Sequence, residues 1–109
     1  MGDRGNVVIK YFDGNKIFFY SHWGGSGLKE TVRQALKRGQ GRWNDESYLA
    51  RIVFSEMTKD EAMELTGYGI SPYEIDNENP LVTVDTKAQT VNGIPFEDYI
   101  KNPIQQEEY

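Results

Sequence analysis

The sequence predicts an α+β fold in which two to three helices pack on one face of a mostly antiparallel sheet. Strand-like segments open the chain, helical periodicity fills its middle, and strand-like segments return in its second half. Strands grouped before and after the helices are typical of α+β proteins rather than of a parallel α/β sheet. The 109 residues fit one domain. We expect this domain to span residues 1–102, followed by a polar C-terminal tail, residues 103–109.

The chain opens with a predicted β-hairpin. Residues 6–12 and 16–22 are rich in β-branched and aromatic side chains, and the Asp13-Gly14-Asn15 turn between them tolerates positive φ angles. Alternation along the two strands places Val7, Ile9 and Tyr11 on one face, with Ile17 and Phe19 as the matching set. The opposite face then carries Phe18, Tyr20 and His22.

Two helices are predicted in the middle of the chain. The first ends at Gly39 and has an apolar stripe at helical spacing, formed by Leu28, Val32, Ala35 and Leu36. The second begins with Asn44 or Asp45 as its N-cap, and its broad apolar stripe to Met57 favours packing against the sheet. Thr58 and Glu61 match a capping box, so a further short helix to about Leu65 is expected.

The second half of the chain predicts three more strands and a short helix. Residues 66–72 are expected to form a short edge strand, because Pro72 cannot donate to a ladder. An acidic loop over residues 74–80 precedes strands at 81–86 and 88–91, which a tight turn connects. Residues 95–100 are expected to form one or two helical turns.

Composition excludes several classes of function. Without cysteine the chain forms no disulfide, no zinc–thiolate site and no catalytic thiol. No apolar run reaches the ~20 residues that span a bilayer, and no signal peptide precedes the first strand. We therefore expect a protein without membrane contact that stays in the cytoplasm.

The net charge of −5 is unevenly distributed. Residues 1–51 carry nine basic and five acidic side chains, or +4, whereas residues 52–109 carry three basic and twelve acidic ones, or −9. An acidic protein does not coat long nucleic acids, yet a local basic pocket for one small anion remains compatible with this split. The alternative is that the two halves pair with each other in the fold.

The sharpest local feature is a glycine-rich turn between the hairpin and the first helix, made of His22, Trp23, Gly24, Gly25, Ser26 and Gly27. Backbone N–H groups in such a turn, together with the positive end of a helix dipole, can bind an anion. Trp23 would stack on a ring and His22 would donate to a phosphate. The spacing matches neither the dinucleotide fingerprint nor the Walker A motif. The alternative is a tight connection whose glycines let the chain bend while Trp23 packs in the core.

A second cluster combines arginines with aromatic residues. Arg42, Trp43, Tyr48 and Arg51 offer guanidinium forks for phosphate or carboxylate beside stacking surfaces. Arg33 lies on a basic face of the first helix, and Tyr68 adds another aromatic side chain. Since Arg51 lies within an apolar stretch, we expect it to be partly buried and paired, either with a ligand or, as the favoured reading, with Glu56 or Asp76.

The sequence offers little for metal binding or catalysis. Glu74, Asp76 and Glu78 alternate in the acidic loop, but their spacing does not match an EF-hand, and a solvated loop is favoured over a metal site. His22 is the single histidine, and its neighbours Ser21 and Ser26 lack a nucleophile-elbow context. We expect no cofactor and no metal.

Several segments together resemble a family of small proteins carried by phages and bacterial mobile elements. These segments are YSHWGGSG, RWNDESYLARIVFSEM and TGYGIS, followed by DNENP, and they cover nearly the whole chain. The sequence departs from the family pattern at Gly27-Leu28-Lys29, where an acidic residue and a proline are typical. The family brings no assigned activity, but the resemblance implies a role against host defence and a location in the host cytoplasm.

These observations predict a non-enzymatic binding protein that sequesters a small nucleotide-like anion and so blocks bacterial immune signalling, in the manner of homo-oligomeric phage sponge proteins. The expected ligand-binding residues are His22, Trp23, Gly24, Gly25, Ser26, Arg33, Arg42, Trp43, Tyr48, Arg51 and Tyr68. One alternative is a protein–protein inhibitor whose acidic second half covers a basic site on a host factor. The other is a nucleotide hydrolase that uses His22.

Overall fold

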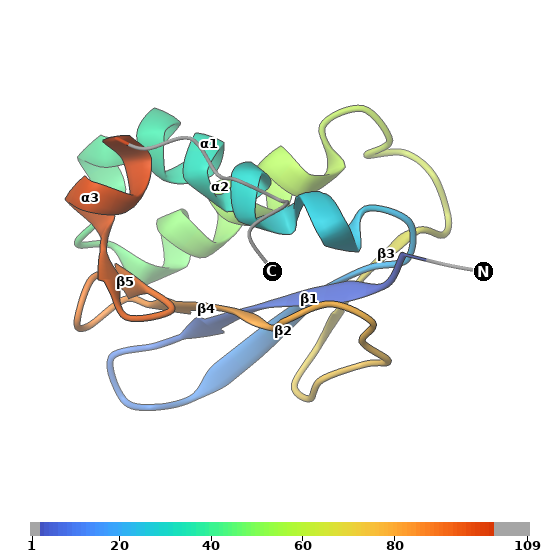
Figure 1. Cartoon of the computed structure of the whole chain (residues 1–109), viewed down its shortest axis with the longest axis horizontal. Helices are drawn as coiled ribbons and strands as arrows, with labels where there is room; N and C mark the ends of the chain where they lie inside the picture. Colours follow the sequence, from blue (N-terminus) through green and yellow to red (C-terminus); the bar gives the residue numbers. More distant parts are fainter. Residues whose placement is uncertain (1–2, 102–109) are drawn as a thin grey trace.

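Six strands form one sheet in the computed structural model, which describes residues 3–101 of the chain (Figure 1). The strands are β1 (Gly5–Lys10), β2 (Lys16–Ser21), β3 (Tyr68–Ser71), β4 (Val82–Asp85), β5 (Thr90–Val91) and β6 (Ile94–Pro95). The helices are α1 (Leu28–Arg38), α2 (Glu46–Thr58) and α3 (Phe96–Lys101), with the 3-10 turns η1 (Gly25–Gly27) and η2 (Gln40–Arg42). All three α-helices lie on the same face of the sheet.

The sheet is mostly antiparallel, as predicted. Its strand order is β3-β2-β1-β4-β5-β6, and β1 with β4 is the one parallel pair among the five pairs of the described chain. Strand β3 therefore forms one edge, which confirms the predicted edge strand at residues 66–72. The predicted α+β class is confirmed.

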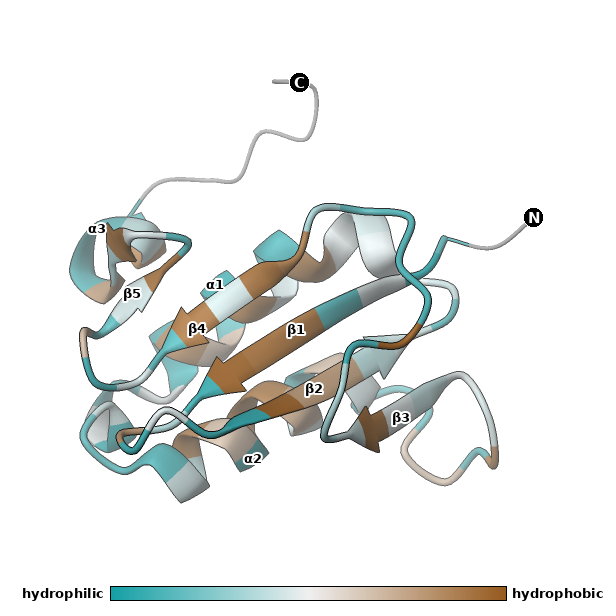
Figure 2. Ribbon diagram, turned by 90° about the horizontal axis from the view of Figure 1, so that it is seen from below, coloured by the Kyte–Doolittle hydropathy of each residue, from teal (hydrophilic) through white to brown (hydrophobic). Residues whose placement is uncertain are grey.

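The hairpin supplies the centre of the core. Val7 pairs with Phe19 on one face, as the alternation predicted, and the structure buries both side chains in the hydrophobic core. The hydrophobic residues of β1, β2 and β4 gather in the middle of the sheet (Figure 2). Val8 on the opposite face is also buried. Nearby, the side-chain amide of Asn6 donates to the carbonyl of Ile75 at 2.7 Å, so the 72–80 connection lies against the sheet face that the helices leave open.

The two long helices follow their sequence signals at their starts. The predicted stripe of α1 is fully buried, and the Asp45 carboxylate caps α2 by accepting from the Tyr48 N–H at 3.1 Å. The predicted helix from Thr58 to Leu65 is wrong. The Thr58 hydroxyl donates back to the Phe54 carbonyl at 3.1 Å instead of capping a new helix, and residues 59–63 form successive turns.

The C-terminal part confirms the predicted strands and short helix. Asp85 closes the turn after β4 by accepting from the N–H groups of Lys87 and Ala88. Strand β6 was not predicted; it is two residues long and pairs with β5. The predicted polar tail, residues 103–109, lies outside the described residues. Within residues 3–101, no helix has the length and apolarity that crossing a bilayer requires.

Candidate functional site

The glycine-rich turn holds an anion that the chain itself supplies. The Ser26 N–H donates to both carboxylate oxygens of Asp3, at 3.1 and 3.0 Å, and the Ser26 hydroxyl donates to one of them at 2.6 Å. These bonds from the Ser26 side chain, the Asn79 amide and the Ser26 backbone lower the pKa of Asp3. The turn therefore has the anion-binding chemistry that the sequence predicted, but its donors face Asp3.

Close backbone packing explains the buried glycine of this turn. A Cβ at Gly25 would lie 2.5 Å from the Asn79 amide nitrogen and 2.6 Å from the Arg4 carbonyl carbon. The Gly25 N–H also donates to the Asp3 carbonyl at 2.6 Å. Only glycine lets the chain segments approach this closely. Glycine is required at position 25 because a side chain there would clash with Arg4 and Asn79.

Trp23 stands on the surface beside this turn. Its side chain is 60% exposed, so the alternative that placed it in the core is wrong. The ring lies against Gly67, where a Cβ would come within 2.8 Å of it. His22 contacts Trp23 edge-on, with ring centroids 4.9 Å apart, and the Nδ1 atom of His22 lies 2.6 Å from the Tyr20 hydroxyl. The turn thus presents an indole that neighbouring groups hold in place.

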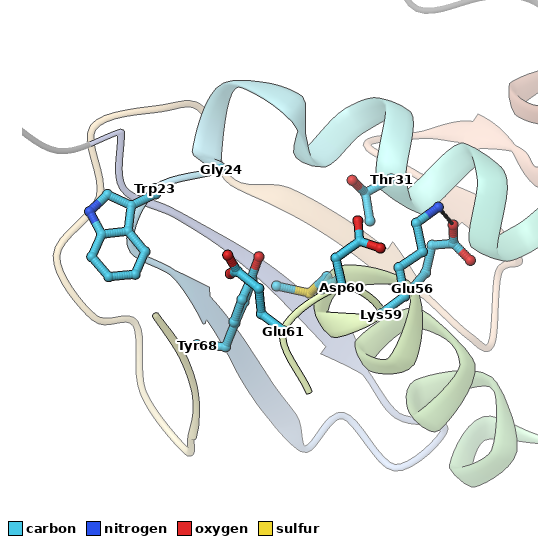
Figure 3. Close-up of a pocket in the computed structure, with 9 residues that line it drawn as sticks. Trp23, Gly24, Thr31, Glu56, Lys59, Asp60, Glu61 and Tyr68 are labelled. Atoms are coloured by element: carbon cyan, nitrogen blue, oxygen red, sulfur yellow. Dashed lines mark hydrogen bonds and ion pairs between the residues drawn. The ribbon is translucent and has the colours of Figure 1, made fainter. Parts of the chain in front are cut away.

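A pocket of about 440 Å³ opens between Trp23 and Tyr68 (Figure 3). Trp23 follows β2, Tyr68 begins β3, and the other walls come from the start of α1 and the end of α2. The pocket is lined by Trp23, Gly24, Thr31, Glu56, Met57, Lys59, Asp60, Glu61 and Tyr68. Two aromatic residues therefore share one cavity with three carboxylates and one ammonium group.

The charge of the pocket is negative. Glu56 is neutralised locally, because it pairs with Arg38 at 3.1 Å and with Lys59 at 3.0 Å. Burial raises the pKa of Glu56, but the hydrogen bonds from Lys59 and Arg38 outweigh burial and lower it overall. Asp60 and Glu61 are exposed and have no ion pair within residues 3–101. Both carboxylates line the pocket that Trp23 and Tyr68 also line, with Glu61 next to Tyr68 and Asp60 on the Thr31 side (Figure 3).

The pKa of Tyr68 responds to this negative charge. Burial, the charge of Glu61, a hydrogen bond to Glu61 and the charge of Asp60 all raise the pKa of Tyr68. Figure 3 shows the side chains of Tyr68 and Glu61 next to each other on the pocket wall. The phenol therefore stays protonated beside the Glu61 carboxylate.

The predicted arginine cluster lies at the other end of α1. Eleven residues at 1.5 Å rise separate the two ends by roughly 16 Å. There the Arg42 guanidinium lies 5.0 Å from the centroid of the exposed Tyr48 ring. Trp43 is half-buried, donates through Nε1 to the Leu36 carbonyl at 3.0 Å and packs against Phe96.

Two predicted arginines have other environments. Arg51 is exposed, so its expected burial is wrong. Of its suggested partners, Glu56 pairs with Arg38 and Lys59, and Asp76 pairs with Arg4 at 3.7 Å. Arg33 contacts Glu30 at 2.8 Å and donates to the Ile100 carbonyl at 3.1 Å, which ties α1 to α3.

The structure thus joins one part of the predicted site and separates the rest. Trp23, Gly24 and Tyr68 line the same pocket, with His22 against Trp23. Gly25 and Ser26 face Asp3. Arg33 lies on α1 and bonds to Glu30 and to the Ile100 carbonyl. The other four residues lie beyond the far end of α1 or along α2: Arg42, Trp43, Tyr48 and Arg51. The fold therefore does not bring the whole predicted set into one pocket.

Sequence reasoning missed Asp60 and Glu61 as site residues. The capping-box pattern assigned this segment to a helix, which would have turned successive side chains to different sides. The signal available in the sequence was the pair of adjacent acids followed by Met63 and Leu65. The structure leaves both of these apolar side chains more than nine-tenths exposed.

The described residues assemble neither a serine–histidine pair nor a metal cluster. The Ser21 hydroxyl accepts from the Gly24 N–H at 3.0 Å and the Ser26 hydroxyl donates to Asp3, while His22 faces Tyr20. Between residues 3 and 101 no three His, Cys, Asp or Glu side chains converge in a way that would hold a metal ion. In the acidic loop, Glu74 accepts from Asn77.

No protein-family profile, curated protein or solved structure matches this chain. The fold and the site define an α+β protein with an acidic, aromatic pocket. The resemblance to phage and mobile-element proteins stays a prediction.

Proposed function

We propose that this protein is a non-enzymatic binding protein whose site is the Trp23–Tyr68 pocket and whose ligand presents a cationic group. The observation that carries the proposal is a pair of carboxylates, Asp60 and Glu61, that line the same pocket as two aromatic rings. Neither carboxylate has an ion pair in the part of the chain that the structure describes. An ammonium or guanidinium group satisfies both features at once, through charge and through contact with the π faces.

The expected affinity for a lone cationic side chain is low. Cation–π contacts contribute about 0.5–1 kcal/mol at exposed sites and about 2 kcal/mol when desolvated. Exposed ion pairs add about 0.2–1 kcal/mol each. Together these contributions correspond to dissociation constants on the order of millimolar or weaker. A physiological ligand therefore needs further contacts, as a protein partner supplies.

This proposal favours one of the functions that the sequence predicted, a protein–protein inhibitor that uses the acidic second half of the chain. Asp60, Glu61 and Tyr68 all belong to that half. In a phage setting, as the sequence resemblance implies, the partner would be a host protein with an accessible lysine or arginine.

The test is a titration followed by NMR, with acetyl-arginine amide as the probe and acetyl-citrulline amide as its uncharged counterpart. We expect the indole N–H of Trp23 to shift saturably with the arginine probe and at least fivefold less with citrulline. The double variant Asp60→Asn with Glu61→Gln should abolish the shift. Glu64→Gln, which removes one carboxylate from the same segment but outside the pocket, should leave it unchanged. Equal responses to arginine and citrulline would overturn the proposal.

A second candidate keeps the predicted small nucleotide-like anion and moves it to the arginine cluster. The specific observation is that Arg42 stacks on Tyr48 at 5.0 Å while Arg51 lies exposed on the same helix, three residues further along. This arrangement offers charge and a stacking surface on one side of α2. Titration with ADP-ribose and with cyclic dinucleotides should give heat that Arg42→Gln removes, and Lys37→Gln is the matched control. No heat with any of these nucleotides would remove this candidate.

A further inference from the structure

The outer edge of β3 carries unused backbone hydrogen-bonding groups. The backbone N–H of His22 donates to the Gly67 carbonyl at 2.9 Å, so the backbone polar groups of Gly67 point toward β2. In an antiparallel ladder the residues that bond to a given neighbour alternate. Gly69 and Ser71 therefore also face β2, and Tyr68 and Ile70 direct their N–H and C=O groups away from the sheet. No residue between 3 and 101 forms a backbone hydrogen bond with Tyr68 or Ile70 on that outer side.

The side chains next to this edge lie on the pocket side of the sheet. Ile70 pairs with Phe19 and Tyr68 pairs with Ser21, and Phe19 packs against Phe54 of α2. Directly paired residues share a face, so Tyr68 and Ile70 both face the helix layer. Ile70 is nevertheless 55% exposed, because α2 does not cover the edge strand. The segment leading into β3 adds two further exposed apolar side chains, Met63 and Leu65.

An added strand would therefore have its in-register side chains beside the pocket. The residue opposite Tyr68 would extend over the helix face of the sheet, where Asp60 and Glu61 supply negative charge. An apolar residue two positions away would cover Ile70. Charge complementarity thus selects an extended segment with a basic residue flanked, at alternate positions, by apolar ones.

We propose that a partner protein docks an extended segment onto the free edge of β3 and places a lysine or arginine side chain into the Trp23–Tyr68 pocket. The inference rests on the proposed function and names the kind of partner that this site fits. Main-chain bonds to Tyr68 and Ile70 supply affinity, and the pocket supplies specificity. A second copy of this chain fits less well, because β3 itself, YGIS, carries no basic residue.

The experiment uses acetyl-Val-Thr-Arg-Thr-Val-amide as the probe, compared with acetyl-arginine amide. Two modified peptides form a matched pair. In one the central arginine is N-methylated, which removes the N–H that faces Tyr68; in the other the following threonine is N-methylated, which removes an N–H on the far side. We expect the unmodified peptide to bind at least tenfold more tightly than acetyl-arginine amide. N-methylation at arginine should weaken it about tenfold, and N-methylation at threonine less than twofold.

A variant of the protein tests the same contact from the other side. Ile70→Pro removes an N–H that β2 does not use, so the ladder is retained while the edge is blocked. We expect this variant to bind the peptide no better than acetyl-arginine amide, and Ile70→Ala to keep most of the gain. Should Ile70→Pro fail to fold, the two N-methylated peptides decide the matter on the wild-type protein.

The outcomes separate the two proposals. If acetyl-arginine amide binds and the peptide binds no more tightly, edge pairing is overturned and the proposed function stands. If both N-methylated peptides bind equally well, edge pairing is overturned too. If neither probe binds, the proposed function itself fails. A dimer that Ile70→Pro converts to monomer would assign the edge to a second copy and overturn the proposed partner.

Discussion

Asp3 shows how one residue determines the use of a local motif. Its carboxylate accepts from Ser26 and, at 2.8 Å, from the side-chain amide of Asn79, so it joins the N-terminal segment to the glycine-rich turn and to the loop before β4. The sequence identified the donors of this turn correctly. It could not identify their acceptor, because Asp3 lies 23 positions before Ser26 and the two meet only in the fold.

We expect Asp3→Asn to reduce the free energy of unfolding by about 1 kcal/mol at pH 7, the usual net contribution of a side-chain hydrogen bond. Folding lowers the pKa of Asp3 from 3.8. Its ionised form therefore stabilises the fold above that pH, and the contribution is lost as the pH falls through the lowered pKa. Urea unfolding at pH 7 and at pH 3 should show a smaller difference between the two proteins at pH 3. An undiminished difference at pH 3 would contradict a role for the carboxylate charge.

Gly67 is the second residue with a definite role, because it positions Trp23. Its φ of 101° disfavours any side chain, and an added Cβ would meet the indole at 2.8 Å. Gly93 has a comparable φ of 86° but open space around it. Substituting Gly93 by alanine therefore measures the cost of the backbone conformation alone.

We expect Gly67→Ala to destabilise the fold by more than about 1 kcal/mol and to displace the Trp23 ring. Its affinity for acetyl-arginine amide should fall at least threefold, whereas Gly93→Ala should lose stability but keep its affinity. NMR titration of the two variants makes the comparison. Unchanged affinity in a folded Gly67→Ala protein would show that the position of Trp23 does not matter for binding.

At the scale of elements, sequence patterns succeeded where a stripe or a turn dominates. The buried stripe of α1 and the Asp13–Asn15 hairpin turn were predictable because each depends on residues close in sequence. The end of α2 was not, since the Thr58 hydroxyl bonds back to Phe54 and removes the apparent capping box. As a result, residues 59–63 form turns instead of a helix, and Lys59, Asp60 and Glu61 line the pocket.

The free edge of β3 makes a prediction about amide exchange. Tyr68 and Ile70 direct their N–H groups outward, so their amides should exchange with solvent deuterium at least tenfold faster than those of Gly69 and Ser71. Hydrogen exchange followed by NMR on the free protein measures this directly. The peptide with an unmodified backbone should then slow Tyr68 and Ile70 selectively. Uniform protection along β3 in the free protein would mean that its edge is already occupied.

At the scale of the whole molecule, the uneven charge is only partly internal. Three of the five ion pairs within residues 3–101 join the basic first half to the acidic second half: Arg4–Asp76, Lys10–Asp85 and Arg38–Glu56. The predicted alternative that the halves pair with each other therefore holds for these residues. Asp60 and Glu61 after α2, Arg42 before it and Arg51 within it are not included in that pairing.

This separation predicts that Arg42 does not influence ligand binding in the acidic pocket at physiological salt. Arg42 precedes α2 and Asp60 follows it, so the 13 residues of α2 at 1.5 Å rise place about 20 Å of helix between them, which exceeds the ~8 Å Debye length at physiological ionic strength. Arg42→Gln should therefore change the affinity for acetyl-arginine amide by less than twofold at 150 mM salt. A larger change, measured by the same NMR titration, would indicate that the two clusters form one site.

The most direct test of the central claim is the location of a bound guanidinium group. Intermolecular NOEs should be measured on the wild-type protein with saturating acetyl-arginine amide. We expect contacts from the arginine Cδ protons to the rings of both Trp23 and Tyr68, and their loss in the Asp60→Asn, Glu61→Gln double variant. Saturable binding with NOEs to other rings, or NOEs that persist in the double variant, would contradict an acidic, aromatic pocket as the binding site.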